Sequence, residues 1–173
     1  MIKERAYIGI DPGYSQASPG AMALIEGRFI EVYDWTTEVE MCEQLKTWLV
    51  IYDVHCAALE EVHAQSYLTR DKRTGIVSAQ SQKGSSNFNF GANYGFWRGV
   101  LLGLDVPFEL VKPSEWMGSY NLRKKINRKD KPSLDVAREM YPGAPLKYKK
   151  NHGRADALLI ATWLRKKYAS TLR

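Results

Sequence analysis

The stretch Tyr7-Ile8-Gly9-Ile10-Asp11-Pro12-Gly13 is a short apolar run that ends in a carboxylate and then turns at Pro-Gly. A β-strand of this kind places its acid at the edge of a sheet, where α/β proteins bind their ligands. Two other stretches match it in character. Ala57-Ala58-Leu59-Glu60-Glu61 is a second apolar run ending in acid, and His152-Gly153-Arg154-Ala155-Asp156 begins a C-terminal helical segment. Together the three stretches could supply hard ligands to a divalent metal.

The residues that follow the first run predict the antiparallel part of a sheet. Residues 5–11 form the first strand, and residues 14–20 form a turn rich in Ser, Gly, Ala and Pro. Residues 21–25 and 29–35 are two further apolar runs, joined by a tight hairpin turn that contains Gly27. A strand followed closely by a hairpin is expected to form a three-stranded antiparallel unit.

A crossover helix and two more strands extend this sheet. Residues 38–52 carry apolar side chains at helical spacing on one face, which predicts an amphipathic helix. A strand at residues 55–60, reached through that helix, is expected to run parallel to its neighbour and to bring Glu60 to the edge that carries Asp11. The remaining expected elements are a helix at 88–104, a strand at 107–112, and helices at 132–141 and 151–168.

This order predicts a single α/β domain over residues 1–173. Its core is a mixed five-stranded sheet, with three antiparallel strands and then parallel strands, flanked by helices. In the 88–104 helix, Gly recurs every fourth residue from Gly91 to Gly103. Gly destabilises a helix, so this face suggests close approach by another backbone. A second copy of the helix and the sheet itself remain alternatives for that backbone.

The basic side chains favour a polyanionic partner such as nucleic acid, because the net charge is +6. They concentrate in a long loop at residues 64–87, which includes Lys83, and in the segment 121–131. Charge runs are usually solvated surface. These two segments, however, flank the predicted acidic edge, where Lys and Arg would neutralise phosphates.

Cysteine content and hydropathy favour a cytoplasmic protein with no membrane contact. Cys42 and Cys56 lie in apolar segments without metal-type spacing, which predicts two buried, reduced thiols. No apolar run approaches the length of a membrane span, and the first strand follows the N-terminus directly, so no targeting segment is expected.

The acidic residues suit metal-dependent phosphodiester hydrolysis. His152 and Asp156 are four residues apart, which puts both side chains on one face of a helix. Carboxylates with one imidazole favour Mg²⁺ or Mn²⁺. Each residue also has a plainer interpretation: Asp11 as a turn residue, Glu60 as a solvated strand end, His152 as a helix cap and Asp156 as a surface acid.

With these residues in hand, the sequence resembles the RuvC-type Holliday-junction resolvases of the ribonuclease H-like superfamily, and is most similar to phage-encoded and chloroplast members. Residues 9–13 match the first motif of that family, Ala58-Leu59-Glu60 matches the second, and residues 154–161 match the last. The second match selects Glu60 over Glu61. Typical bacterial members have an acid or His three residues before the final Asp, where this chain has Gly153. The four-residue spacing resembles the plastid branch, so the third ligand is assigned to His152, with Asn151 or water as the alternative.

The resemblance implies a homodimeric, structure-selective endonuclease that resolves four-way DNA junctions by paired nicking. Its products would carry 5′-phosphate and 3′-hydroxyl ends. The implied cofactor is Mg²⁺, and Mn²⁺ is expected to work in its place. The implied catalytic and metal-binding residues are Asp11, Glu60, His152 and Asp156. The DNA-binding candidates are basic residues of the long loop and of the segments around 112–131: Lys83, Lys112, Lys124, Lys125 and Lys131.

Three other functions are weighed beside this one. The chain could be a less selective nuclease for branched or single-stranded DNA, or a junction-binding protein whose acids are structural. Asp-Pro-Gly after a strand also occurs in the phosphate loop of actin-like ATPases. That fold needs two such domains, and this chain lacks a second Asp-x-Gly loop after a strand.

Overall fold

A mixed five-stranded sheet forms the centre of the computed structural model, which describes residues 4–15, 18–61, 66–70, 74, 77–81, 84–122 and 132–171. The strands are β1 (Ala6–Ser15), β2 (Ser18–Glu26), β3 (Phe29–Asp34), β4 (Val54–Glu60) and β7 (Phe108–Val111). They lie in the order β3-β2-β1-β4-β7. β1, β2 and β3 pair antiparallel, whereas β4 pairs parallel with β1 and with β7. The predicted fold class is therefore confirmed.

β1 is longer than the sequence predicted, because Pro12-Gly13 does not end it. The strand continues to Ser15, and its pairing with β2 shifts register between Asp11 and Tyr14. Proline has no N–H for the ladder, so the chain accommodates it as an irregularity in the antiparallel pairing. The parallel pairing with β4 stops at Ile10 and Leu59. Asp11 thus lies at the end of the parallel ladder and not at the end of the strand.

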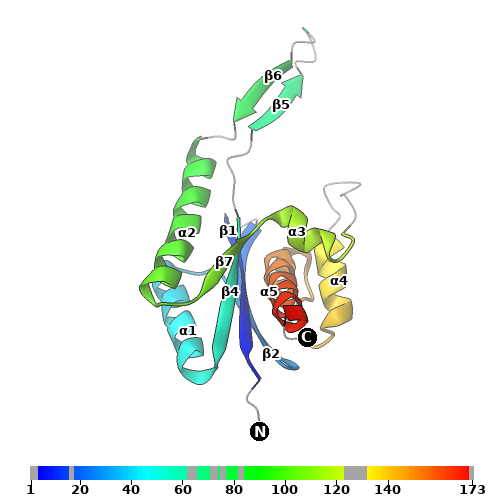
Figure 1. Ribbon diagram of the computed structural model, residues 1–173. Coiled ribbons are helices and arrows are strands. Elements are labelled where there is room, and N and C mark those ends of the chain that lie inside the picture. Colours follow the sequence, from blue (N-terminus) through cyan, green and yellow to red (C-terminus); the bar gives the residue numbers. More distant parts are fainter. Residues whose placement is uncertain are drawn as a thin grey trace.

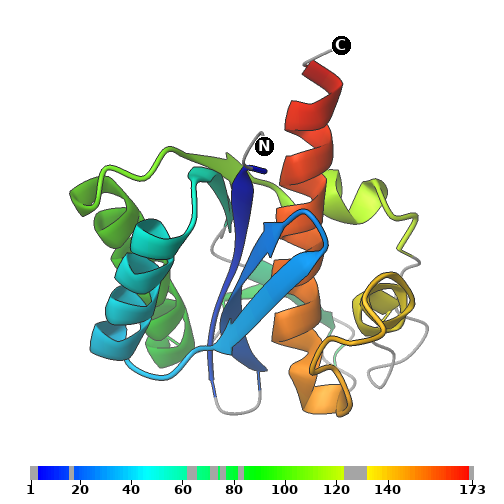
Figure 2. The ribbon, with the colours of Figure 1, turned by 90° about the horizontal axis from the view of Figure 1, so that it is seen from below.

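Helices cover both faces of the sheet (Figures 1 and 2). α1 (Glu38–Ile51) and α2 (Gly84–Gly103) lie on one face, over a core that includes Ile8, Ile10, Leu59 and Trp48. α5 (His152–Thr171) lies on the other face, with α3 (Pro113–Gly118) and α4 (Pro132–Met140) packed around it. A 3₁₀ turn, η1 (Lys149–Asn151), leads into α5. The sheet therefore separates two apolar cores.

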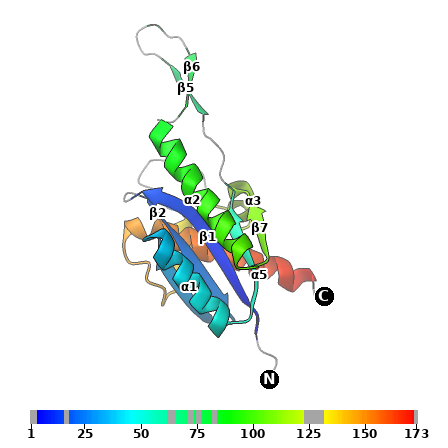
Figure 3. The same cartoon turned by 90° about the vertical axis from the view of Figure 1, so that its left-hand side faces the viewer.

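A β-hairpin stands away from the body at the end of the sheet where β4 finishes (Figures 1 and 3). It consists of β5 (Ser66–Arg70) and β6 (Val77–Ser81), which pair antiparallel. The prediction of a long loop at residues 64–87 was wrong for these residues, and α2 begins at Gly84, earlier than expected. Polar strands with few large apolar side chains lack the hydrophobic alternation that identifies a strand from sequence.

The glycine face of α2 does not pack on the sheet. A Cβ atom placed at Gly91, Gly95, Gly99 or Gly103 would meet nothing within 4 Å. All four positions are exposed. Of the two alternatives for this face, tight packing on the sheet is wrong, and a partner helix remains.

The prediction of two buried thiols is confirmed for Cys56 but not for Cys42, which is only partly buried. Cys42 and Cys56 are both free, and Cys56 is buried. Among the described residues, no helix combines the length and the apolar character needed to cross a bilayer.

α5 packs directly on the backbone of β1 at Gly9. A Cβ at Gly9 would overlap the carbonyl oxygen of Ala157 and the amide nitrogen of Ala161. Further along, the Tyr168 ring lies 6.2 Å from the Tyr7 ring. Tyr7 therefore contacts the last turns of α5 and Gly9 contacts its first half, so the helix runs antiparallel to β1. The start of α5 comes to the end of the sheet that carries Asp11, as Figure 2 shows.

We predict that Gly9→Ala lowers the free energy of unfolding by about 3 kcal/mol or more, because backbone atoms of α5 occupy the space of the new methyl group. Gly118→Ala, at the end of α3, is the matched control. It adds a methyl group to an exposed helix position with nothing within 4 Å, and should stabilise by up to about 1 kcal/mol. Urea denaturation measures both, and equal effects would contradict the packing described here.

Candidate functional site

Strand register brings Asp11 and Glu60 side by side. Ile10 pairs with Leu59 in the parallel ladder, and the two acids are the next residues on their strands. Neighbouring strands are about 4.8 Å apart. Side chains alternate along a strand, so Asp11 shares the α5 face with Tyr7 and Gly9, and Glu60 shares it with Cys56 and Ala58. Both carboxylates therefore point toward α5.

α5 supplies the other two predicted residues. His152 is its first residue, and Asp156 lies one turn later. Asp156 directly precedes Ala157, whose carbonyl faces Gly9. Both side chains are partly buried, and Nδ1 of His152 is shielded from solvent. The start of the helix thus lies over the ends of β1 and β4.

Glu60 and Asp156 interact electrostatically across this contact. Burial, and after it the negative charge of Asp156, together raise the pKa of the Glu60 carboxyl from 4.5 to about 7. The Trp116 indole N–H opposes part of this rise, although it makes no hydrogen bond of normal geometry in the described part of the structure. Two carboxylates from distant parts of the chain therefore share one poorly solvated space.

The Pro12-Gly13 irregularity fixes the position of Asp11. The backbone N–H of Gly13 donates to Oδ1 of Asp11 at 3.1 Å, which is the turn interaction that a plain structural role predicts. Asn93 of α2 is 4% exposed and donates from Nδ2 to the carbonyl oxygens of Pro12 at 3.0 Å and Gly13 at 2.8 Å. α2 therefore anchors the segment that follows Asp11.

An ion pair fastens the first turn of α5 to the far edge of the sheet. Arg154 donates from Nε to Oδ1 of Asp34 at 2.6 Å and from Nη2 to Oδ2 at 2.5 Å, a bidentate pair. It also donates to the carbonyl of Pro145. Asp34 pairs with Ala21, and Ala21 pairs with Asp11, so these three residues form one row across the sheet. Arg154 thus ties the helix turn that carries His152 and Asp156 to the row that carries Asp11.

The donor set fits a hard divalent cation in chemistry, since it offers carboxylate oxygens and one imidazole. Mutual repulsion between Glu60 and Asp156 is a cost that a cation would relieve. Within the described ranges, however, no three His, Cys, Asp or Glu side chains are grouped closely enough to hold a metal ion. Asn151, the alternative third ligand, is 5% exposed and accepts the N–H of Tyr148 with its side-chain oxygen at 2.8 Å. It is thereby committed to the turn before α5.

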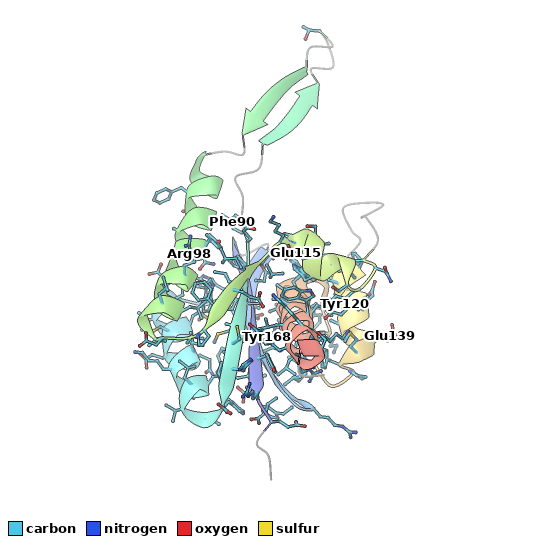
Figure 4. All side chains as sticks on the ribbon, in the orientation of Figure 1. Phe90, Arg98, Glu115, Tyr120, Glu139 and Tyr168 are labelled. Atoms are coloured by element: carbon cyan, nitrogen blue, oxygen red, sulfur yellow. The ribbon has the colours of Figure 1, made fainter. Side chains whose placement is uncertain are left out.

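Among the predicted DNA-binding residues, Lys112 lies between β7 and α3 with its side chain exposed. Val111 before it pairs with Glu60, so Lys112 is near the acidic end of the sheet. Lys83, Lys124, Lys125 and Lys131 lie outside the described residues. Figure 4 shows Phe90 of α2 and Glu115 of α3 bordering this end of the sheet. Trp116 is 2% exposed and belongs to the core.

Sequence reasoning did not identify three residues that shape this site: Asn93, Arg154 as a clamp, and Asp34. Asn93 is a polar residue on the buried face of α2. Sequence alone does not show which face of α2 is buried, so it does not reveal that Asn93 is unusual. Arg154 was within a recognised motif, but its partner is 120 residues away in the chain. A long-range ion pair leaves no local pattern in the sequence.

Comparison with known proteins finds similarity to Holliday junction resolvases. A chloroplastic Holliday junction resolvase of Chlamydomonas reinhardtii is 40% identical over 74 residues, which is 40% of this chain and 8% of that protein. The chain therefore matches only a small part of the length of that relative. No family model matches the sequence.

Two solved structures share the fold. RuvC of Thermus thermophilus in complex with a Holliday junction substrate superposes with a TM-score of 0.58 at 15% identity, and RuvC of the same organism in a second structure gives 0.52 at 17%. In both cases 96% of each chain is covered. The resemblance to RuvC-type resolvases that the motifs indicated is thus confirmed, in fold by these structures and in sequence by the plastid relative.

We predict that the metal-free protein loses stability as pH rises from about 5 to 7. The folded state keeps a proton on Glu60 up to about pH 7, whereas the unfolded chain releases it near 4.5. The contribution of Glu60 to the free energy of unfolding is therefore fully present below pH 4.5. It is lost, by about 3 kcal/mol, as the pH rises through the folded-state pKa of about 7. Glu60→Gln should remove this fall, and the exposed control Glu115→Gln should keep it. Urea denaturation across pH tests this, and a fall that survives in Glu60→Gln would contradict it.

We also predict that Arg154→Lys, which keeps the charge but not the bidentate geometry, lowers the free energy of unfolding by about 1 to 2 kcal/mol. Combined with Asp34→Asn, it should show a coupling of about 1 kcal/mol in a double-mutant cycle. The exposed Lys46 and Glu43 pair is the matched control, with an expected coupling below about 0.5 kcal/mol. Strict additivity at Arg154 and Asp34 would exclude the clamp.

Proposed function

We propose that this chain is a structure-selective endonuclease that resolves four-way DNA junctions by paired nicking, with residues 1–173 as one nuclease domain. The observation that carries the proposal is the convergence of Glu60 and Asp156 beside Asp11, in a fold shared with RuvC. The junction named with the Thermus protein and the activity named for the plastid relative support the choice of substrate. The net charge of +6 suits a DNA partner.

The proposed ligands for Mg²⁺, or for Mn²⁺ in its place, are Asp11, Glu60, His152 and Asp156. A bound divalent ion would lower the pKa of the attacking water and stabilise the leaving 3′ oxygen. In the reaction, the water oxygen forms a bond to phosphorus and the bond from phosphorus to the 3′ oxygen breaks. The products are a 5′-phosphate and a 3′-hydroxyl.

The residues of the chain itself would hold and orient the reacting groups. The paired ends of β1 and β4 fix Asp11 and Glu60, and the close contact of α5 at Gly9 fixes Asp156. Trp116 and the surrounding core limit water around Glu60, which strengthens electrostatic interactions there. Arg154 would act as a positioning residue, because it sets the angle of the helix turn through Asp34.

Paired nicking requires two copies of the site, and we propose that the chain acts as a homodimer through α2. The exposed glycine face of α2 allows close approach of a second helix. Beside it, Val39, Phe96 and Val100 line an open apolar groove of about 300 Å³ between α1 and α2. Val39, at one side of this groove, is 72% exposed, so its side chain is accessible to a partner. A cytoplasmic location, in a bacterial host if the chain is phage-encoded, stays a prediction.

The test is a panel of synthetic four-way junctions, forks, single strands and linear duplexes, with and without Mg²⁺. We expect symmetric nicks in the junction alone, and only with the metal. Asp11→Asn should keep junction affinity within about twofold and reduce nicking by at least about 100-fold. The matched control Asp53→Asn removes an exposed acid at the opposite end of the sheet and should nick at the wild-type rate.

Each other outcome points to a different function. Equal cutting of forks and single strands would show a less selective nuclease. Junction binding without cleavage by the wild-type protein would show a binding protein whose acids are structural. Undiminished nicking by Asp11→Asn would exclude the proposed ligand set.

A further inference from the structure

We propose that Lys147, Tyr148, Lys149 and Lys150 form a cationic platform, assembled before DNA binds, that holds the phosphate backbone of the DNA beside the acidic site. The proposal rests on the proposed function, because it names a contact surface for the same DNA. None of the four residues was among the predicted DNA-binding residues. The platform extends the site on the side where α5 begins.

The platform is next to the site in the chain and in space. Its last residues form η1, which leads through Asn151 into His152, the first residue of α5. All four side chains are exposed, and Tyr148 is 56% exposed. Backbone N–H groups at the start of a helix attract anions, so the adjoining end of α5 adds to the positive potential.

The backbone of the platform is held from both sides. Leu146 before it is 2% exposed and Asn151 after it is 5% exposed, so both flanks are buried. Arg138 of α4 donates from Nε to the carbonyl of Leu146 at 2.8 Å and from Nη2 to that of Lys147 at 2.9 Å. The backbone N–H of Asn151 donates a hydrogen bond to the carbonyl oxygen of Tyr148 at 2.9 Å. The exposed side chains are thus carried by an ordered segment.

One aromatic ring gathers two ammonium groups. Nζ of Lys147 lies 5.5 Å from the centroid of the Tyr148 ring, and Nζ of Lys150 lies 5.9 Å from it. Cation–π contacts at exposed positions contribute about 0.5 to 1 kcal/mol each. They hold two like charges near one another, an arrangement that an anion would stabilise.

The described part of the structure does not neutralise the charges of the platform. Residues 141–151 contain no Asp or Glu. In the part of the chain that the structure describes, Lys147, Lys149 and Lys150 form no ion pair, whereas Lys46 pairs with Glu43 and Lys167 pairs with Glu109. Lysines that are gathered and uncompensated lose less freedom on binding and release more counterions from DNA than scattered, paired ones. The chemistry therefore selects backbone phosphates as the ligand.

The test measures affinity for a four-way junction and for a linear duplex over a series of salt concentrations, without divalent metal so that no strand is cut. We expect the combined Lys147→Ala, Lys149→Ala and Lys150→Ala variant to flatten the slope of log affinity against log salt by about 2 to 3 on both DNAs. Lys46→Ala, the matched control, should keep the wild-type slope. Thermal unfolding checks that each variant is folded.

Tyr148 separates an assembled platform from three independent lysines. Tyr148→Ala keeps every positive charge, yet should weaken binding by at least about threefold because the ammonium groups lose their common contact. Tyr148→Phe keeps the ring and should bind as the wild type does. An unchanged slope in the lysine variant, or wild-type affinity in Tyr148→Ala, would overturn the proposal.

The duplex distinguishes this proposal from the proposed function. A protein that binds duplex and junction equally, but loses slope in the lysine variant, would contradict junction selectivity and support the platform. A protein that prefers the junction, with an unchanged slope in that variant, would support the function and exclude the platform.

Discussion

The contact between α5 and β1 at Gly9 is the constraint on which the rest of the structure depends. Backbone atoms of Ala157 and Ala161 occupy the space that a side chain at this position would take. Because the two backbones approach so closely, α5 can place Asp156 near the strand ends that carry Asp11 and Glu60. Aromatic contacts of Tyr168 with Tyr7 and His55 hold the other end of the helix, as the position of Tyr168 in Figure 4 illustrates.

Glu60 and Asp156 repel each other when both are ionised, and contacts elsewhere in the structure oppose that repulsion. Burial and the charge of Asp156 together disfavour ionisation of Glu60, so the close approach of α5 to the sheet is less favourable once both carboxyl groups are charged. The bidentate pair of Arg154 with Asp34 and the hydrogen bond from Tyr120 to the carbonyl of Leu159 oppose this movement. These two contacts keep Glu60 and Asp156 close together despite the repulsion between their charged forms.

The surface is divided in a way that suits a protein acting on DNA. The β5 and β6 hairpin rises from the acidic end of the sheet (Figure 1). The platform around Tyr148 directly precedes α5 in the chain. The glycine face of α2 and the apolar groove beside it face away from α5, on the other side of the sheet. One end of the sheet is therefore polar and charged, while the α2 side carries exposed glycines and an apolar groove.

The sequence by itself determined the order of the five strands of the central sheet, the parallel placement of β4 and the resemblance of the acid motifs, but not the hairpin of β5 and β6. These follow from local patterns: apolar runs, helical periodicity and short motifs whose residues are neighbours in the chain. Pro12-Gly13 was misjudged as a strand end, because only the pairing partners on β2 and β4 show on which side the ladder continues. Only the tertiary structure decided the exposure of the α2 glycines, the clamp of Arg154 on Asp34, the hold of Asn93 on the Pro12-Gly13 segment and the charge coupling of Glu60 with Asp156. Each of these depends on which surfaces meet across tens of residues of intervening chain, and that information has no local pattern to carry it.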